Sequence, residues 1–186
     1  MEIKERKLKG VYEITLKPNI DPRGFFMRTF DAEIFKDADI ERNWVQENHS
    51  LSRGKGIIRG LHCQLPPKSE TKLVRCINGA VFDVYVDLRR TSETFGEWDS
   101  IELSAENNKM VYIPRGFAHG FCTLTDCSEV VYKVDNTYSP ENEIGILWND
   151  SDIKIDWPTN TPILSVKDES NMLLREFMKT IGGISI

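Results

Sequence analysis

The stretch KLVRCINGAVFDVYVDL, residues 72–88, decides the fold class of this chain. Its first half carries closely spaced apolar residues, and its second half alternates strictly between apolar and polar ones. Alternation with a period of two is typical of a β-strand whose two faces meet different surroundings. Asn78-Gly79, between the halves, is a favoured two-residue hairpin turn. We therefore predict an antiparallel hairpin over residues 72–88.

The second half of this stretch has one apolar face and one polar face. The apolar face carries Phe82, Val84, Val86 and Leu88, and the other carries Asp83, Tyr85 and Asp87. A polar strand face is usually solvated, but polar groups that face an interior need partners or water. The pattern leaves two interpretations open, a solvated face and a wet pocket inside the fold.

Eight further segments have the composition of short strands and are separated by Gly, Pro, Asn and Asp. They are residues 10–16, 24–30, 44–52, 57–64, 98–103, 110–113, 120–125 and 129–134. Many short strands with such punctuation are typical of an antiparallel β-sandwich or barrel, such as a jelly roll. We therefore predict a mainly β fold, and the length of 186 residues fits a single domain over residues 1–186.

Helical patterns are short and few. A short helix is predicted over residues 32–35. A longer one is predicted after Asp168, near the C-terminus, where apolar residues recur with helical spacing. Ser165 stands three residues before Asp168, which is the spacing of an N-terminal capping box. The helix is therefore expected to begin near Ser165.

The chain is acidic, with a formal net charge of −5. This argues against non-specific binding to nucleic acid, which needs a basic surface, although a local cluster of Arg and Lys can still hold an anionic ligand. The charged start MEIKERKLKG has no signal-peptide pattern, and no apolar run is long enough to span a bilayer. We expect a cytoplasmic protein without nucleic-acid or membrane partners.

Cysteines and histidines give little support for a metal site. The four cysteines form no CxxC pair and are expected to be free thiols; they are Cys63, Cys76, Cys122 and Cys127. A cupin metal site needs two or three His with a carboxylate on neighbouring strands. The chain has only His49, His62 and His119, with no HxH pair, so no metal is expected. A lone His in a strand protein is more often structural than catalytic, so the residue type alone does not assign any of the three to catalysis.

Six runs spread over most of the chain carry a family resemblance. They are DPRGFF (21–26), QENHS (46–50), the long run from RGLHCQ to IPRGFAHGF (59–121), YKVDNTYSPENEIGILWND (132–150), IDWP (155–158) and SVKD (165–168). In order and spacing they resemble the dTDP-4-dehydrorhamnose 3,5-epimerase family, over roughly residues 8–175. This resemblance implies a cupin-like jelly roll without metal and without a cofactor. It also implies epimerisation at carbons 3 and 5 of a nucleotide-linked 4-keto-6-deoxyhexose.

The resemblance also implies catalytic roles. His62 matches the proton acceptor and Asp168 the carboxylate paired with it; Tyr132 matches the proton donor, and Lys72 a residue near the sugar ketone. These residue types suit the reaction. Removing a weakly acidic proton beside a ketone needs a base that works near neutral pH, and the enolate needs a cationic or hydrogen-bonding partner.

Substrate-contacting positions follow from the same resemblance. They are Arg23, Gln46, Asn48, Arg59, His119, Glu143 and Lys167, with Tyr138 as the aromatic that stacks on the nucleotide base. Family members are homodimers that exchange an N-terminal strand, which implies that Arg23 serves the pocket of the partner subunit.

Arg28, in FFMRTF, is the main departure, because the family usually places Glu there. A cationic donor at the nucleotide end suits cytosine or a purine carbonyl, so a CDP- or GDP-linked sugar is an alternative substrate. Inversion at one carbon only is a further alternative, because relatives that epimerise a single carbon have similar sequences. Cys63 replaces an aromatic residue, from which we expect only a local change in packing. Two other classes are a metal-dependent cupin oxygenase and a non-catalytic sugar-binding module.

Overall fold

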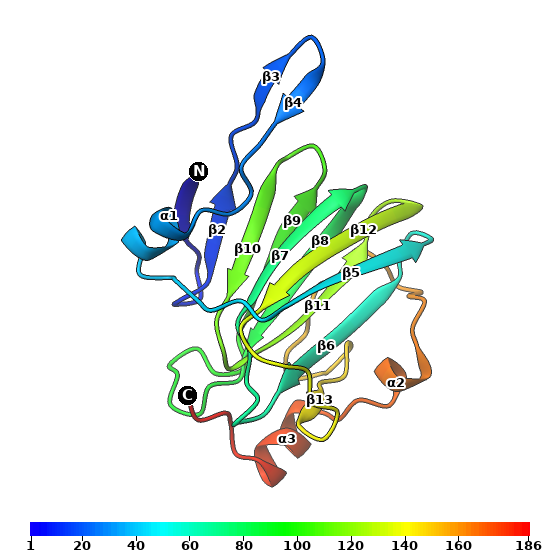
Figure 1. Ribbon diagram of the computed structural model, residues 1–186. Helices are drawn as coiled ribbons and strands as arrows, with labels where there is room; N and C mark the ends of the chain where they lie inside the picture. The colour runs from blue at the N-terminus through cyan, green and yellow to red at the C-terminus, as the bar shows by residue number, and fades with distance from the viewer.

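Two antiparallel sheets form a sandwich in the computed structural model, which describes residues 1–186 (Figure 1). The six-stranded sheet has the order β1 (Glu2–Glu5), β2 (Tyr12–Thr15), β10 (Lys109–Ile113), β7 (Lys72–Asn78), β12 (Cys127–Val134) and β5 (Gln46–Arg53). The five-stranded sheet has the order β13 (Glu143–Gly145), β6 (Ile58–Gln64), β11 (Phe117–Thr123), β8 (Ala80–Asp87) and β9 (Trp98–Ser104). The predicted mainly β architecture is confirmed.

The predicted hairpin over residues 72–88 is wrong. β7 and β8 are consecutive strands, but each pairs with strands of its own sheet. Gly79, at φ +69°, turns the chain from one sheet into the other, and a Cβ there would collide with the Cys127 carbonyl oxygen. An alternating pattern does not say which strand lies alongside, so it fits this crossing as well as a hairpin. Both faces of β8 are buried: Val84 and Val86 pack under the C-terminal segment, whereas Val81 and Tyr85 face the other sheet. Val74 of β7 and Val81 of β8 accordingly share one core cluster between the sheets.

Three core clusters hold the layers together. The cluster between the sheets includes Tyr85 and Val111. The outer face of the five-stranded sheet is covered by the C-terminal segment, where Trp157 and Phe177 pack on the strands. α1 (Ala32–Asp37) packs its Phe35 on the outer face of the six-stranded sheet. The presence of α1 confirms the predicted short helix. No helix is both long and apolar enough to cross a lipid bilayer.

The predicted C-terminal helix is divided in two. α2 (Val166–Glu169) begins at the predicted cap, where Ser165 Oγ accepts a hydrogen bond from the Asp168 amide at 3.1 Å. α3 (Leu174–Thr180) follows after a break. In the break, the backbone of Met172 bonds to Gly145 and Leu147, so its peptide groups are not free for a helix.

Strand bounds differ from the prediction mainly at the ends. β11 begins at Phe117 rather than at residue 120, and β4 (Gly24–Phe26) stops well before residue 30. β1, β13 and β3 (Asn19–Asp21) were missed, because strands of three or four residues, none of them fully buried, show little apolar alternation. β3 and β4 form a hairpin that projects from the body (Figure 1).

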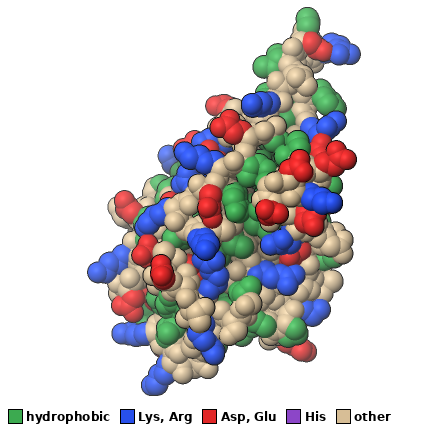
Figure 2. Space-filling model, turned by 90° about the vertical axis from the view of Figure 1, so that its left-hand side faces the viewer, with side chains coloured by type: hydrophobic (Ala, Val, Ile, Leu, Met, Phe, Trp, Pro, Cys, Tyr) green, Lys and Arg blue, Asp and Glu red, His purple; other side chains and the backbone are tan.

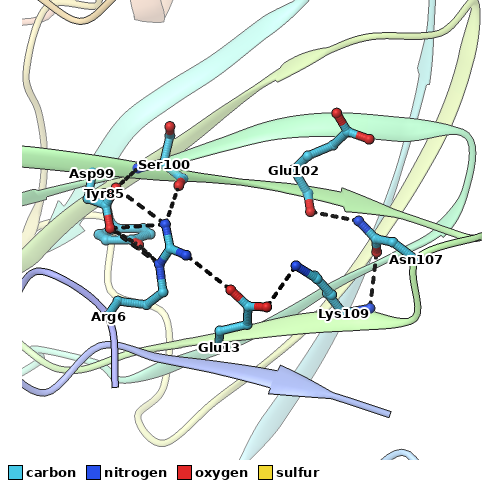
Figure 3. A network of polar contacts seen from close by, with 8 residues as sticks. All are labelled: Arg6, Glu13, Tyr85, Asp99, Ser100, Glu102, Asn107 and Lys109. Atoms are coloured by element: carbon cyan, nitrogen blue, oxygen red, sulfur yellow. Dashed lines mark hydrogen bonds and ion pairs between the residues drawn. The ribbon is translucent and has the colours of Figure 1, made fainter. Parts of the chain in front are cut away.

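Arg6 ties the N-terminal strands to both sheets (Figure 3). Its guanidinium donates to Glu13 of β2 at 3.0 Å and to the Ser100 carbonyl of β9 at 2.8 Å. The Tyr85 hydroxyl, which donates to Asp99 at 2.9 Å, lies within hydrogen-bond distance of the same guanidinium. This network supplies hydrogen-bond partners for the hydroxyl of Tyr85, which is one of the residues on the predicted polar face of β8.

Candidate active site

A cavity of about 270 Å³ opens between the two sheets at the positions that the sequence singled out. Both sheets and the start of α2 contribute to it. Its lining comprises Ser50, Arg59, His62, Lys72, His119, Phe121, Tyr132, Ser165, Lys167 and Asp168. A larger cavity of about 530 Å³ lies beside α1 and contains none of the predicted site residues. The smaller cavity is therefore the candidate active site.

His62 and Asp168 form a hydrogen-bonded pair in this cavity. His62 Nε2 lies 2.6 Å from Asp168 Oδ1, and the other carboxylate oxygen accepts from Ser165 Oγ at 2.8 Å. Because Nε2 faces a carboxylate, it carries a proton in the neutral ring, and Nδ1 is left as the nitrogen that can accept one. Asp168 is 4% exposed, so the pair is shielded from water on the side away from the cavity. The sequence pairing of His62 with Asp168 is thus seen in the geometry.

Asp168 is held in its charged form. Burial alone raises the pKa of Asp168, but the hydrogen bonds from His62 and Ser165 outweigh burial and hold the pKa below its ordinary value. A carboxylate whose pKa falls on folding stabilises the protein above the pKa of the unfolded chain, and this stabilisation is lost as the pH falls through the folded pKa.

We therefore expect Asp168→Asn to lower stability near neutral pH by about 1–3 kcal/mol, because charge-assisted hydrogen bonds are lost. The difference from wild type should shrink as the pH falls below about 4, the ordinary Asp pKa. Thermal unfolding of both proteins from about pH 7 to about pH 3 measures it. A stability difference that does not change with pH would show that Asp168 is not held in its charged form.

His119 and Asp83 form a second pair deeper in the sandwich. His119 lies directly opposite His62 on neighbouring strands, and its Nε2 is 2.9 Å from Asp83 Oδ2. Burial raises the pKa of Asp83, and the attraction of His119 offsets only part of that rise. Of the three residues on the polar face of β8, Asp83 is thus the one that supports the cavity. Asp87 is satisfied elsewhere, by Arg89 and by the hydroxyls of Ser92 and Thr94.

The two histidine strands approach each other unusually closely. A Cβ at Gly60, at φ +124°, would lie 2.6 Å from Gly120 Cα and 2.7 Å from the His119 carbonyl oxygen. The β6–β11 register shifts between His119 and Phe121. Only glycine fits at this close approach of β6 and β11, and the close approach sets the positions of both histidines.

Lys72 and Tyr132 come from the other sheet. Lys72 Nζ forms an ion pair with Glu70 Oε1 and lies 5.6 Å from the centre of the Tyr132 ring. The Tyr132 hydroxyl has no hydrogen-bond partner within the chain, so it is free to meet a ligand. The cavity therefore places a His–Asp pair on one wall and a lysine and a tyrosine on the other.

The predicted substrate-binding residues near the rim form a connected group. Glu143 Oε2 accepts hydrogen bonds from the Tyr138 hydroxyl and from Lys167 Nζ, each at 2.6 Å. Gln46 Oε1 accepts from the Tyr138 amide at 2.7 Å. β13 and α2, which carry Glu143 and Lys167, both lie beside β6 (Figure 1).

The remaining predicted substrate-binding residues do not all lie at the cavity. Arg59 lines the cavity and donates to Ser52 Oγ at 3.0 Å, and Asn48 pairs in register with Tyr132. Arg23 and Arg28 do not line the cavity of their own chain. Arg23 lies in the projecting hairpin and pairs with Asp21, while Arg28 pairs with Asp31 at 2.8 Å.

Sequence reasoning missed several residues of this region. Asp83 was noted only as part of a polar face, and Glu70 and Gln64 were not singled out. Glu70 stands two residues before Lys72, a spacing that places both on one face of an extended strand, and this was the available signal. No group of three or more His, Cys, Asp or Glu side chains is arranged to hold a metal ion.

Comparison with known proteins gives consistent matches. The family model described as dTDP-4-dehydrorhamnose 3,5-epimerase matches residues 5–176. An enzyme of that name from Shigella flexneri is 54% identical over 149 residues, which cover 80% of this chain and 82% of the relative. The Salmonella typhimurium enzyme of that name is 46% identical over 171 residues, 90% of this chain and 93% of the relative.

Solved structures agree with these matches. A 4-keto-6-deoxy sugar epimerase from the novobiocin gene cluster of Streptomyces spheroides superposes with a TM-score of 0.95 at 35% identity, covering 100% of this chain and 93% of that one. A Legionella pneumophila 3,5-epimerase in complex with dTDP-4-keto-L-rhamnose gives a TM-score of 0.89 at 40% identity, covering 94% and 93%. This chain belongs to the dTDP-4-dehydrorhamnose 3,5-epimerase family.

Proposed function

We propose that this protein is an isomerase that converts dTDP-4-dehydro-6-deoxyglucose into dTDP-4-dehydrorhamnose by inverting carbons 3 and 5. The observation that carries the proposal is the His62–Asp168 pair, which faces Lys72 and Tyr132 across one cavity. An acid and a base on opposite walls are what the inversion of a carbon beside a ketone requires. The dTDP sugars named for the relatives support the choice of nucleotide.

Proton removal is assigned to His62. Its Nδ1 accepts the proton of carbon 3 or carbon 5, and the C–H bonding electrons move into the ring to form an enolate at the 4-ketone. The imidazolium that results is stabilised by Asp168, whose lowered pKa keeps it ionised. The substrate ketone itself takes up the electron pair, so the proposal needs no redox or metal cofactor.

The enolate oxygen is assigned to Lys72. A fixed ammonium group lowers the energy of the developing negative charge more strongly in a cavity than in bulk water. The Tyr132 hydroxyl then donates its proton to the opposite face of the same carbon, which re-forms the ketone and leaves a phenolate. Proton exchange with water restores Tyr132 and His62 before the second carbon reacts.

Binding of the nucleotide is assigned to the rim. Arg59 and Lys167 supply positive charge for the pyrophosphate, and Tyr138 supplies an aromatic face for the base. Glu143 and Gln46 hold Tyr138 in place by the hydrogen bonds described above. Asn48 and His119 complete the contacts to the sugar.

Product analysis tests the proposed function. The purified protein is incubated with dTDP-4-dehydro-6-deoxyglucose, the ketone is reduced with borohydride, and the sugar is released by acid. Inversion at both carbons yields L-rhamnose and 6-deoxy-L-talose. Inversion at one carbon yields other 6-deoxyhexoses and would correct the proposal, and recovery of only D-fucose and D-quinovose would overturn it.

We also propose that the protein is a homodimer in which the β3–β4 hairpin reaches the partner subunit. Ile20, Phe25 and Phe26 are 80%, 64% and 70% exposed on this hairpin. Figure 2 shows the hairpin as a projection at one end of the molecule, with apolar side chains along it and charged ones near its tip. Large apolar side chains exposed together favour burial against another surface. Arg23, at the turn, would then enter the cavity of the partner.

Two substitutions separate assembly from binding. Phe25→Asp should shift the protein from dimer to monomer in light scattering, because it places a charge in the buried contact. Arg23→Ala should leave the dimer intact and weaken dTDP binding roughly tenfold, because one charge-assisted contact is lost. A wild-type monomer, or an Arg23→Ala protein that binds dTDP normally, would contradict the proposed arrangement.

A further inference from the structure

Glu70 and Gln64 adjoin the cavity without belonging to the acid–base set. We propose that Glu70 is a positioning residue which, held by Gln64, fixes the Lys72 ammonium group in the cavity and connects it to the loop that carries Tyr138. The inference rests on the proposed function, because it gives Glu70 a role only through the action of Lys72 on the ketone.

Glu70 is the sole hydrogen-bond acceptor of Lys72 in the chain. The side chains of the pair are 12% and 10% exposed, so water does little to screen the contact. Lysine has a flexible four-carbon stem and a compact charge, and its packing alone does not fix where the ammonium lies. Apart from Glu70, the Tyr132 ring lies 5.6 Å from Lys72 Nζ and the Asp83 carboxylate attracts the same charge, but neither accepts a hydrogen bond from it. Glu70 therefore determines where Lys72 meets the substrate.

Gln64 holds Glu70 from the other side. It is 3% exposed and lies on β6 two residues after His62. Its Nε2 donates to Glu70 Oε2 at 2.9 Å and to the Lys68 carbonyl at 3.0 Å. A buried amide with both ends bonded has one orientation, so it fixes the carboxylate that it contacts.

The same amide reaches the nucleotide end of the site. Gln64 Oε1 accepts a hydrogen bond from the Ser139 amide at 2.6 Å, next to Tyr138. A continuous set of hydrogen bonds thus runs from the Tyr138 loop through Gln64 and Glu70 to Lys72. Gln64 therefore contacts both the loop that carries Tyr138 and the carboxylate that holds Lys72.

Substitutions of Glu70 test this role. Glu70→Ala leaves Lys72 without an acceptor and should lower kcat roughly 10- to 100-fold, because displacement of a reacting group by about 1 Å costs up to about 100-fold. KM and the Kd for dTDP should stay within about twofold, since Glu70 is not assigned a contact to the nucleotide. Glu70→Gln keeps an oxygen acceptor for Lys72 but turns its amide NH2 toward the Gln64 donor, so it should recover only part of the rate. Glu97→Ala, which removes the carboxylate of an exposed Glu–Lys pair with Lys7, is the matched control and should behave as wild type.

A double-mutant cycle separates positioning from a general structural effect. If Glu70 acts through Lys72, the Glu70→Ala change should cost little further rate in a Lys72→Met background. If the rate losses of the two single variants multiply in the double variant, Glu70 does not act through Lys72 and the inference is overturned. A Glu70→Ala protein with a kcat within twofold of wild type would also overturn it, provided that the wild type epimerises the sugar. A wild type that does not epimerise the sugar would overturn the proposed function, and this inference with it.

Discussion

His62→Asn should slow epimerisation strongly at both carbons. Asparagine keeps a polar group of similar shape beside Asp168 but cannot take a proton from carbon, and general-base catalysis contributes about 10²- to 10⁴-fold. We expect the rate of deuterium entry at carbons 3 and 5 to fall by that factor. Affinity for dTDP should change by no more than about twofold, because we assign His62 to the sugar and not to the nucleotide.

His49→Asn is the matched control for this experiment. His49 also pairs with a carboxylate, Glu129 Oε2 at 2.8 Å, but it does not line the cavity. The control should retain wild-type rates. Equal losses in both variants, or exchange in His62→Asn at more than about a tenth of the wild-type rate, would show that His62 is not the base.

Tyr132→Phe should separate proton exchange from inversion. Phenylalanine keeps the ring that faces Lys72 but removes the hydroxyl that would return a proton to the opposite face. His62 can still remove a proton and return a deuteron from the same side. We therefore expect product formation to fall about 10²- to 10⁴-fold while deuterium still enters unreacted substrate.

Proton NMR of the recovered substrate, together with product analysis, measures both rates. Tyr12→Phe is the matched control, since Tyr12 packs edge-on against Tyr112 on β10, outside the cavity. Parallel loss of exchange and product in Tyr132→Phe would mean that Tyr132 is needed for enolate formation, which contradicts its assignment as proton donor.

The strands were largely predictable from sequence, and their pairing was not. Alternation in the sequence locates β8 well, because successive side chains on a strand point to opposite faces of the sheet. Alternation does not say which strand lies alongside, and a turn pair such as Asn78-Gly79 serves a sheet-to-sheet crossing as well as a hairpin. The predicted C-terminal helix is present but broken into α2 and α3, for a related reason. The apolar spacing after Asp168 fits a helix, but the backbone of Met172 is bonded to a distant segment, and local pattern does not reveal that.

The site could be predicted only as far as the family resemblance reached. His62 and Asp168 are separated by 106 residues, and no spacing rule joins them. Residues whose role depends on contacts with other side chains were missed for the same reason. Glu70 and Asp83 gain significance only once Lys72 and His119 are seen beside them. Arg23, carried over from the same resemblance, and Arg28, the main departure from it, both lie away from the cavity of their own chain.

The most direct test of double epimerisation by acid–base chemistry is proton NMR of dTDP-4-dehydro-6-deoxyglucose with the chelator-treated wild-type protein in deuterated water. We expect loss of the proton signals at carbon 3 and carbon 5, with both losses dependent on His62. Loss at one carbon only would make the protein a mono-epimerase. Retention of both signals, or exchange that returns only when a metal is added back, would contradict the central claim.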